Sequence, residues 1–369
     1  MASAPSAADQ NWMKGYGVIR HSAETVARIQ SLAGALEAAG RSPAERTYDL
    51  LAAADRLTSA GMWVVAHMTY AQRVDLSGAA LPAEAFKATP EGHTGGSLNM
   101  VPAFVGYLLA NALSGVTRSW IMGQGHCVAA IEAVNALTGD VSPAQQGRYD
   151  RTEAGLSRLA ADFYSYAIGA DGRPAVPVGS HAGPNTAGAV SEGGCLGVAE
   201  GEDGQTPRAG GGVVGLLGGG GPEEQRGSDW SPRWWRAEDS GAAVPVMILN
   251  GRRIEERTQI AQEGGAAWLA DHLRLSGFDP FIVDGRDPAA IAWAILEAEA
   301  RLERFAANPS ARYPAPMPYV IAETVKGFGF PGAGTNLAHN LPLEAAPRSD
   351  ATAREAFNRA ARELFVDAA

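Results

Sequence analysis

Hydrophobic residues beyond position 92 gather in five short runs. The runs are RSWIM (118–122), GVVGLL (212–217), VPVMILN (244–250), PFIVDG (280–285) and PYVIAET (318–324). Short runs that are apolar throughout are typical of strands buried on both faces, and helical patterns lie between several of them. We therefore predict an α/β fold with a mostly parallel sheet and helices on both faces.

Helical spacing of apolar residues is clearest at both ends of this region. Residues 23–60 contain two helical stretches, which begin after good N-cap residues and end at Gly40 and Gly61. A third helix is expected to follow Asp287 as its N-cap, with Pro288 as its first residue. Its apolar face would be formed by Ile291, Ile295, Ala298, Leu302 and Phe305.

The chain divides into one large domain with shorter flanking parts. Residues 1–11 are small and polar, so we expect them to be disordered. Residues 12–345 form the domain, and residues 346–369 a helical tail. Within the domain, residues 197–212 contain almost no apolar side chain, which predicts a mobile loop.

Charge and cysteine content narrow the function classes. The net charge of −10 argues against nucleic acid or an anionic membrane as the main partner. Two cysteines make neither a disulfide framework nor a CxxC metal pair. The N-terminus lacks the pattern of a secretory signal, and no apolar run approaches the ~20 residues of a membrane span. We expect a soluble, cytoplasmic protein.

Two turns that follow predicted strands could bind ligands. The glycines of LLGGGGPEEQRG would let the main chain approach a phosphate, although a plain flexible turn would look the same. Asn250-Gly251 ends the next strand, and an Asn side-chain oxygen there suits a hard divalent cation. Viewed alone, a simple Asn-Gly turn explains this pair as well.

Four of the seven histidines lie in Gly- or Ser-rich sequence that is not helical. They are His93 in EGHTGGSLN, His126 in MGQGHC, His181 in GSHAGPNTAG and His339 in GTNLAHNLPL. Each alone is more often a structural residue. Together they indicate a shared polar cleft that binds phosphates and moves protons, so we expect at least three to converge in one pocket with Asn250 at its floor.

The order of these segments resembles the thiamine-diphosphate-binding half of phosphoketolases, with transketolases as more distant relatives. The resemblance covers residues 90–343 and includes these segments: GHTGGSLN, MGQGH, SHAGPNTAGAVSEGGCLG, LLGGGGPEE, VPVMILNGRRI, GFDPFIVDGRDPAAI and ETVKGFGFPGAGTNLAHNLPL. Seven segments in the same order are far more specific than any single motif.

The resemblance implies thiamine diphosphate and Mg²⁺ as cofactors, and a small phosphorylated sugar as substrate. The four histidines would be catalytic, and Lys326 could touch phosphate. Asn250 and the main-chain carbonyl of Arg252 would bind the metal. The cofactor would be bound by Gly123, Gly125, Gly218, Gly219, Gly220, Asn250 and Gly251.

Three positions depart from the family pattern. Gly219 stands where the family has an acidic metal ligand, so metal binding should be weaker unless Glu223 or Glu224 substitutes. Ser191 and Cys195 replace a histidine and a glutamate.

The family also has a second, pyrimidine-binding domain, which supplies the glutamate that activates the cofactor. The resemblance therefore implies one subunit of a split enzyme, in a homo- or hetero-oligomer with a partner that carries this domain. The complex would cleave a ketose phosphate or an α-hydroxyketone and transfer a two-carbon unit. The alternative is a non-catalytic structural or regulatory subunit with a degenerate cofactor site.

Overall fold

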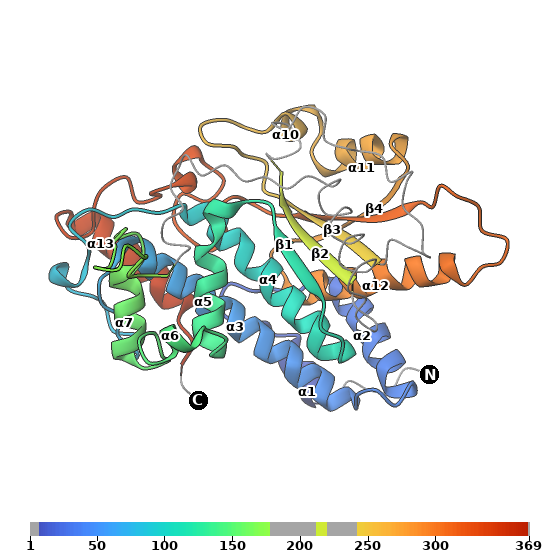
Figure 1. Cartoon of the computed structure of the whole chain (residues 1–369), viewed down its shortest axis with the longest axis horizontal. Helices are drawn as coiled ribbons and strands as arrows, with labels where there is room; N and C mark the ends of the chain where they lie inside the picture. Colours follow the sequence, from blue (N-terminus) through green and yellow to red (C-terminus); the bar gives the residue numbers. More distant parts are fainter. Residues whose placement is uncertain (1–6, 178–211, 220–241, 368–369) are drawn as a thin grey trace.

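A single parallel sheet organises the molecule (Figure 1). The computed structural model describes residues 7–177, 212–219 and 242–367. The strands are β1 (Ser119–Met122), β2 (Gly212–Gly218), β3 (Ala242–Leu249), β4 (Phe278–Asp284) and β5 (Met317–Glu323). They are arranged in the order β1-β2-β3-β5-β4, and every neighbouring pair is parallel. All five predicted apolar runs are therefore strands.

Helices surround this sheet and form the N-terminal third of the chain. The α-helices are α1 (Ala7–Trp12), α2 (Ala23–Ala38), α3 (Ala44–Tyr70), α4 (Thr94–Ser114), α5 (Ala129–Thr138), α6 (Pro143–Gln146), α7 (Glu153–Asp162), α10 (Gln259–Glu263), α11 (Ala266–Leu275), α12 (Pro288–Ala306) and α13 (Ala351–Leu364). The short 3₁₀ helices are η1 (Ala83–Ala85), η2 (Gly125–Cys127) and η4 (Asn336–His339).

Successive strand residues face two different cores, as expected for a sheet that is buried on both sides. Val214 of β2 belongs to the larger core, which contains α4 and α12. Its neighbour Val213 belongs to the smaller core with Leu269 and Leu273 of α11. Figure 1 shows α11 on one side of the sheet and α4 and α12 on the other. The predicted α/β class, with helices on both faces, is confirmed.

One predicted helix boundary is confirmed and another is wrong. The helix after Asp287 begins at Pro288, and the Asp287 side chain accepts a hydrogen bond from the N–H of Ala289. The prediction that a helix ends at Gly61 is wrong, because α3 continues to Tyr70. A Cβ atom at Gly61 would lie 2.9 Å from the Cγ1 of Val101 in α4, so the glycine permits close helix packing. Glycine here marks a helix contact and not a helix end.

Residues 7–11 are more ordered than their composition suggests, and the tail is helical as predicted. Residues 7–11, which we expected to be disordered, lie in α1, and Trp12 at its end is buried in the core. The tail beyond residue 345 contains α13, and Phe357 anchors it in the core. Of the predicted mobile loop, residues 197–211 lie outside the described residues, whereas Gly212 begins β2.

Helix α4 is the one described helix that is long and apolar enough to cross a membrane. Its most apolar window is 78% buried inside the protein, and buried core helices pass the same test. It packs between α3, α12 and the sheet, so its apolar character serves the core.

Candidate functional site

The loops that follow the parallel strands meet at one edge of the sheet, where ligands bind in open α/β folds. Gly123 follows β1, Gly219 follows β2 and Asn250 follows β3. The loop after β5 runs from Thr324 to η4 and carries Lys326 and His339. We call residues 324–340 the β5 loop.

Three of the four predicted histidines lie together. The ring centroids of His93 and His126 are 4.9 Å apart, and those of His93 and His339 are 5.5 Å apart. The His126 and His339 centroids are 6.0 Å apart. His181 lies outside the described residues. Histidines separated by more than 200 positions in sequence thus form one cluster, which we call the histidine cluster.

Two glycines at the start of α4 allow this convergence. A Cβ atom at Gly95 would clash with the carbonyl oxygen of Ala338 in η4. A Cβ atom at Gly96 would clash with the Sγ atom of Cys127 in η2. Because both positions lack a side chain, η2 and η4 can pack directly on the first turn of α4. The two glycines of GHTGG therefore bring His126 and His339 to His93.

Lys326 completes the cluster. Its Nζ atom donates hydrogen bonds to the carbonyl oxygen of Arg253 and to Nδ1 of His339, both at 2.7 Å. An ammonium group can only donate, so Nδ1 of His339 accepts and its ring proton resides on Nε2. Asn99 of α4 holds the β5 loop by donating to the carbonyl of Val325 and accepting from the N–H of Gly327.

Burial and the lysine charge keep the clustered rings neutral. Burial lowers the pKa of His126 to about 4, and the charges of His93 and Lys326 act in the same direction. The pKa of His339 falls to about 3, again through burial first and Lys326 second. The pKa of His93 is lowered as well, mainly by burial. At neutral pH the cluster therefore presents uncharged imidazoles beside one ammonium group.

A small pocket of about 100 Å³ opens beside His93. Its lining includes Glu91, Tyr164 and Asn340. Two buried atoms at this pocket, Nδ1 of His93 and Oδ1 of Asn340, have no hydrogen-bond partner among the described residues. They remain available to a ligand that carries hydroxyl groups, whereas the nearby Glu91 carboxylate disfavours an anion.

The glycines predicted to bind the cofactor at this edge of the sheet differ in their surroundings. Gly123 donates its N–H to the carbonyl of Leu216, so that donor is already used. Gly125 has open space where a Cβ atom would lie, and Gly251 adopts a positive φ of 75° in a turn. A Cβ atom at Gly218 would clash with the side chain of Gln124. Gly220 lies outside the described residues.

Sequence reasoning missed Gln124, which fills the space above Gly218 between two predicted cofactor-binding loops. Its Oε1 atom is buried without a hydrogen-bond partner among the described residues. It also missed Asn99, although a polar residue within the apolar pattern of α4 was a usable signal. Asn340 gave no signal, because asparagine after a loop histidine is common in turns.

Comparisons with known proteins identify the family to which the chain belongs. A family model described as the XFP N-terminal domain matches residues 46–358. The chain belongs to this family. It is 29% identical over 328 residues to a protein named "Probable phosphoketolase" from Streptomyces coelicolor, which covers 83% of this chain and 39% of that protein.

Other proteins similar to this chain are also matched over only part of their length. A "Probable phosphoketolase" from Rhodopseudomonas palustris strain BisB5 is 28% identical over 246 residues, covering 61% of this chain and 30% of that protein. A transketolase structure from Pichia stipitis is 16% identical with a TM-score of 0.47, covering 85% of this chain and 44% of that one. The chain thus spans less than half the length of these relatives.

The described residues do not complete a magnesium site for the cofactor that the family resemblance implies. A hard divalent cation favours carboxylate oxygens, but position 219 is glycine. The side-chain oxygen of Asn250 accepts a hydrogen bond from the N–H of Arg252 at 3.1 Å, and its place at the floor of the histidine cluster stays a prediction. Glu223 and Glu224 lie outside the described residues.

Proposed function

We propose that this chain is one subunit of a split thiamine-diphosphate enzyme. With a partner that carries a pyrimidine-binding domain, it would cleave a ketose phosphate or an α-hydroxyketone and transfer a two-carbon unit. The observation that supports this most is the convergence of His93, His126 and His339 around Lys326. Membership of the XFP N-terminal domain family and the partial coverage of phosphoketolases point the same way.

The histidine cluster suits a substrate with hydroxyl groups and a phosphate. Neutral imidazoles donate one hydrogen bond and accept another, so they can hold a hydroxyl group and exchange its proton. Burial lowers the pKa of Lys326 to about 8, so the group remains mostly charged at pH 7 and attracts an anion. The start of α4 at His93 adds main-chain N–H groups and the positive end of a helix dipole.

Exposed apolar residues near the cluster support the need for a partner. Val325, Leu337 and Ile254 are 42%, 44% and 55% exposed. They lie close together, because Asn336 of η4 bonds to both Arg252 and Glu255, and Lys326 bonds to Arg253. We call these three residues the apolar rim. Burying them against another protein would gain about 25 cal/mol for each Å² of apolar surface.

The rim can be tested without any assay of activity. We expect Leu337→Glu to weaken assembly with the pyrimidine-binding partner by at least ~10-fold, since an apolar contact would be lost and a carboxylate would have to leave water. The matched control is Leu275→Glu at the end of α11, where the side chain is 86% exposed and lies just before the start of β4, whereas the rim residues follow strand ends. Equal affinities for the two variants in sedimentation or calorimetry would mean that the rim is not the interface.

The function itself is tested by reconstitution. The isolated chain should show no turnover of xylulose 5-phosphate or fructose 6-phosphate, whereas the chain mixed with a pyrimidine-binding protein encoded next to it should produce acetyl phosphate or a new ketose. Calorimetry with thiamine diphosphate and Mg²⁺ should likewise give binding only in the complex. Robust turnover by the purified chain alone would overturn the split-enzyme proposal.

A non-catalytic subunit is the second candidate. Gly219 in place of a carboxylate and the Gln124 side chain against Gly218 favour it, because both act at the metal and diphosphate edge. In that case the complex would assemble but would bind no thiamine diphosphate through this chain. Assembly together with an absence of cofactor binding would therefore select this candidate.

A further inference from the structure

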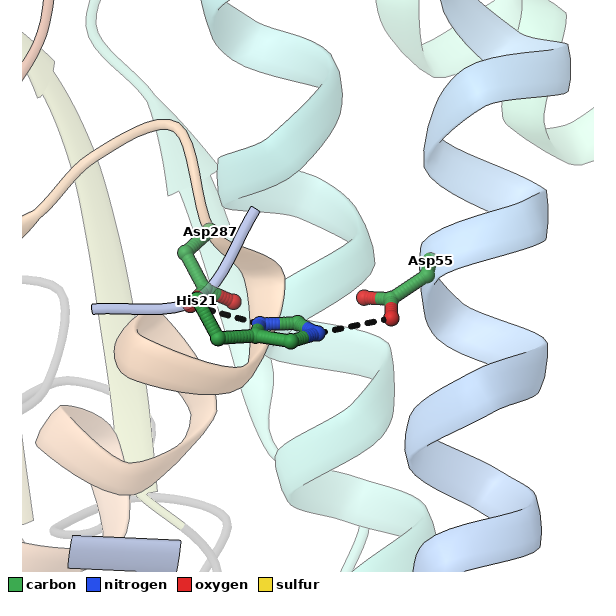
Figure 2. Close-up of side chains that lie close together, drawn as sticks. All are labelled: His21, Asp55 and Asp287. Carbon is green, nitrogen blue, oxygen red and sulfur yellow. Dashed lines mark hydrogen bonds and ion pairs between the residues drawn. The ribbon is translucent and has the colours of Figure 1, made fainter. Parts of the chain in front are cut away.

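A buried ion triplet lies away from the histidine cluster, between α3 and the start of α12 (Figure 2). Nδ1 of His21 lies 2.9 Å from a carboxylate oxygen of Asp287, and Nε2 lies 3.0 Å from one of Asp55. The side chains of all three residues are at most 2% exposed. None of them belongs to a predicted site.

The three groups are arranged around protons and not around a metal ion. Their ligand atoms lie within 4.8 Å of one another, as metal ligands do. A metal, however, would need both carboxylates beside the same ring nitrogen. Figure 2 shows that Asp55 and Asp287 approach opposite sides of the His21 ring. Each contact has the length of a hydrogen bond and requires one proton, so two protons hold the triplet together with a net charge of −1.

The surroundings explain which groups carry the charges. Asp287 is the N-cap of α12 and accepts the N–H of Ala289 with its other oxygen, where the positive end of the helix dipole favours a negative charge. The ring of Trp12 lies against His21 with centroids 4.3 Å apart and an interplanar angle of 33°, which favours an imidazolium. The other oxygen of Asp55 is buried with no hydrogen-bond partner among the described residues.

Two other charged groups, Arg286 and Asp9, lie near the triplet. Arg286, next to Asp287, pairs with Asp284 and also feels the Asp287 charge. On the α1 side, the charge of Asp9 acts on Tyr48. His21 itself feels the charges of Asp287 and Asp55.

The segment that His21 holds also supports the β5 loop. Val18 packs on Gly329 of this loop, where an added Cβ atom would lie 3.2 Å from its Cγ2. At the other end of the triplet, the guanidinium of Arg286 lies 5.8 Å from the ring centroid of Phe328. The β5 loop, which carries Lys326 and His339, is therefore contacted from both sides of the triplet.

We propose that His21, Asp55 and Asp287 form a two-proton latch that fixes residues 16–22 against the β5 loop and thereby positions Lys326 and His339. This proposal does not depend on which reaction the histidine cluster carries out. Residues 16–22 lie outside the family match at 46–358, whereas Asp55 and Asp287 lie within it, so the latch joins the segment before the match to the matched domain.

The latch should weaken at alkaline pH. Burial alone would lower the pKa of His21, but hydrogen bonds to Asp287 and Asp55 and their charges raise it to about 10. A pKa raised in the folded state gives stability that is complete below the unfolded value of about 6.5 and is lost as pH rises through the folded value. The wild-type melting temperature should therefore fall steadily between pH 6.5 and 10.

The test compares His21→Gln with His272→Gln. His272 of α11 also stacks on a tryptophan, Trp268, but lies on the other side of the sheet. At pH 7 we expect His21→Gln to lower the melting temperature by roughly 5–10 °C and to remove most of the alkaline slope, because it leaves two buried carboxylates without their cation. His272→Gln should retain the wild-type slope.

Hydrogen exchange measured by mass spectrometry then tests the link to the site. In His21→Gln, peptides from residues 7–22 and from the β5 loop should both exchange at least ~10-fold faster, while in His272→Gln they should not. Faster exchange in residues 7–22 alone would overturn the positioning role. If His21→Gln does not fold, the wild-type alkaline slope and exchange at pH 7 and 9.5 decide the matter. A flat slope, or protection unchanged by pH, would overturn the latch.

Discussion

The histidine cluster and the latch use the same side chain in opposite charge states. In the cluster, burial and the Lys326 ammonium lower the pKa of His126 and His339 to about 4 and 3. In the latch, burial also acts to lower the pKa, but two carboxylates raise the pKa of His21 to about 10. Burial alone therefore does not decide the charge of a histidine. Buried rings stay neutral unless carboxylates bond to them, as Asp55 and Asp287 do to His21.

The difference in charge gives the histidines of the two regions different roles. Neutral rings with free ring atoms can bind and exchange protons with a ligand, as at Nδ1 of His93. A charged ring whose two nitrogens are both bonded has no such capacity and can only hold other elements in place. Substitutions in the two regions should therefore affect different measurements.

The largest effect is expected in the cluster. In the assembled complex, His126→Ala should slow the chemical step by ~10²–10⁴-fold, because a ring that exchanges protons is lost. His272→Ala on α11 serves as the control and should keep full turnover. The measurement is single-turnover kinetics with fructose 6-phosphate. If His93→Ala, His126→Ala and His339→Ala all retain the wild-type rate, the cluster is not the working site.

A change in the latch should alter stability and its pH dependence. Burial raises the pKa of Asp55 to about 6, although its hydrogen bond to His21 opposes the shift. With a raised folded pKa, wild-type stability is highest below the unfolded value of 3.8 and falls as pH rises through about 6. Asp55→Asn should remove this dependence, which amounts to roughly 2–3 kcal/mol.

Urea unfolding at pH 4, 5, 6 and 7 measures this effect. Asp279→Asn is a suitable control, because Asp279 is half exposed in its pair with Arg301 and lies near the start of β4, whereas Asp287 follows the end of that strand. We expect the free energy of unfolding of the wild type to fall between pH 4 and 6 relative to that of Asp55→Asn. If this free energy changes equally with pH in the two proteins, Asp55 is not the titrating group.

A smaller effect, on cofactor affinity, is expected at position 219 after β2. Gly219→Asp should tighten Mg²⁺-dependent binding of thiamine diphosphate by ~1–3 kcal/mol, by analogy with hydrogen bonds to charged groups. The new Cβ atom would fit, since its nearest neighbour is Cδ1 of Leu249 at 3.4 Å. Calorimetry with and without Mg²⁺ measures the change, and Gly219→Asn controls for size. Unchanged or weaker affinity would mean that position 219 is not a metal position, or that Glu223 already serves.

Much of the fold could be predicted because its signals are local. Each strand contains a short apolar run, and Asp287-Pro288 is a local helix start, so both could be read from neighbouring residues. The prediction of a helix end at Gly61 was wrong, because a glycine at a helix contact looks the same in sequence as one at a helix end. The order of residues 7–11 depends on Trp12, whose burial is a tertiary effect.

The histidine cluster was predictable for a different reason. In a parallel sheet the strand ends share one edge, so His126 and His339, which follow β1 and β5, converge although they are far apart in sequence. His93 instead lies at the start of α4, before the first described strand. No comparable rule predicts the latch from the sequence. His21 lies 34 and 266 positions from its two partners, in a segment before the first long helix, and no motif connects the three.

The protonation of the histidine side chains tests the contrast between the two regions most directly. Two-bond ¹H–¹⁵N spectra of the wild-type protein, assigned with single His→Gln variants, report the charge of each ring as pH changes. We predict that His126 and His339 remain neutral at pH 6, with the His339 proton on Nε2, while His21 remains charged at pH 9. Titration of His126 and His339 near 6.5, or a neutral His21 at pH 8, would contradict the account.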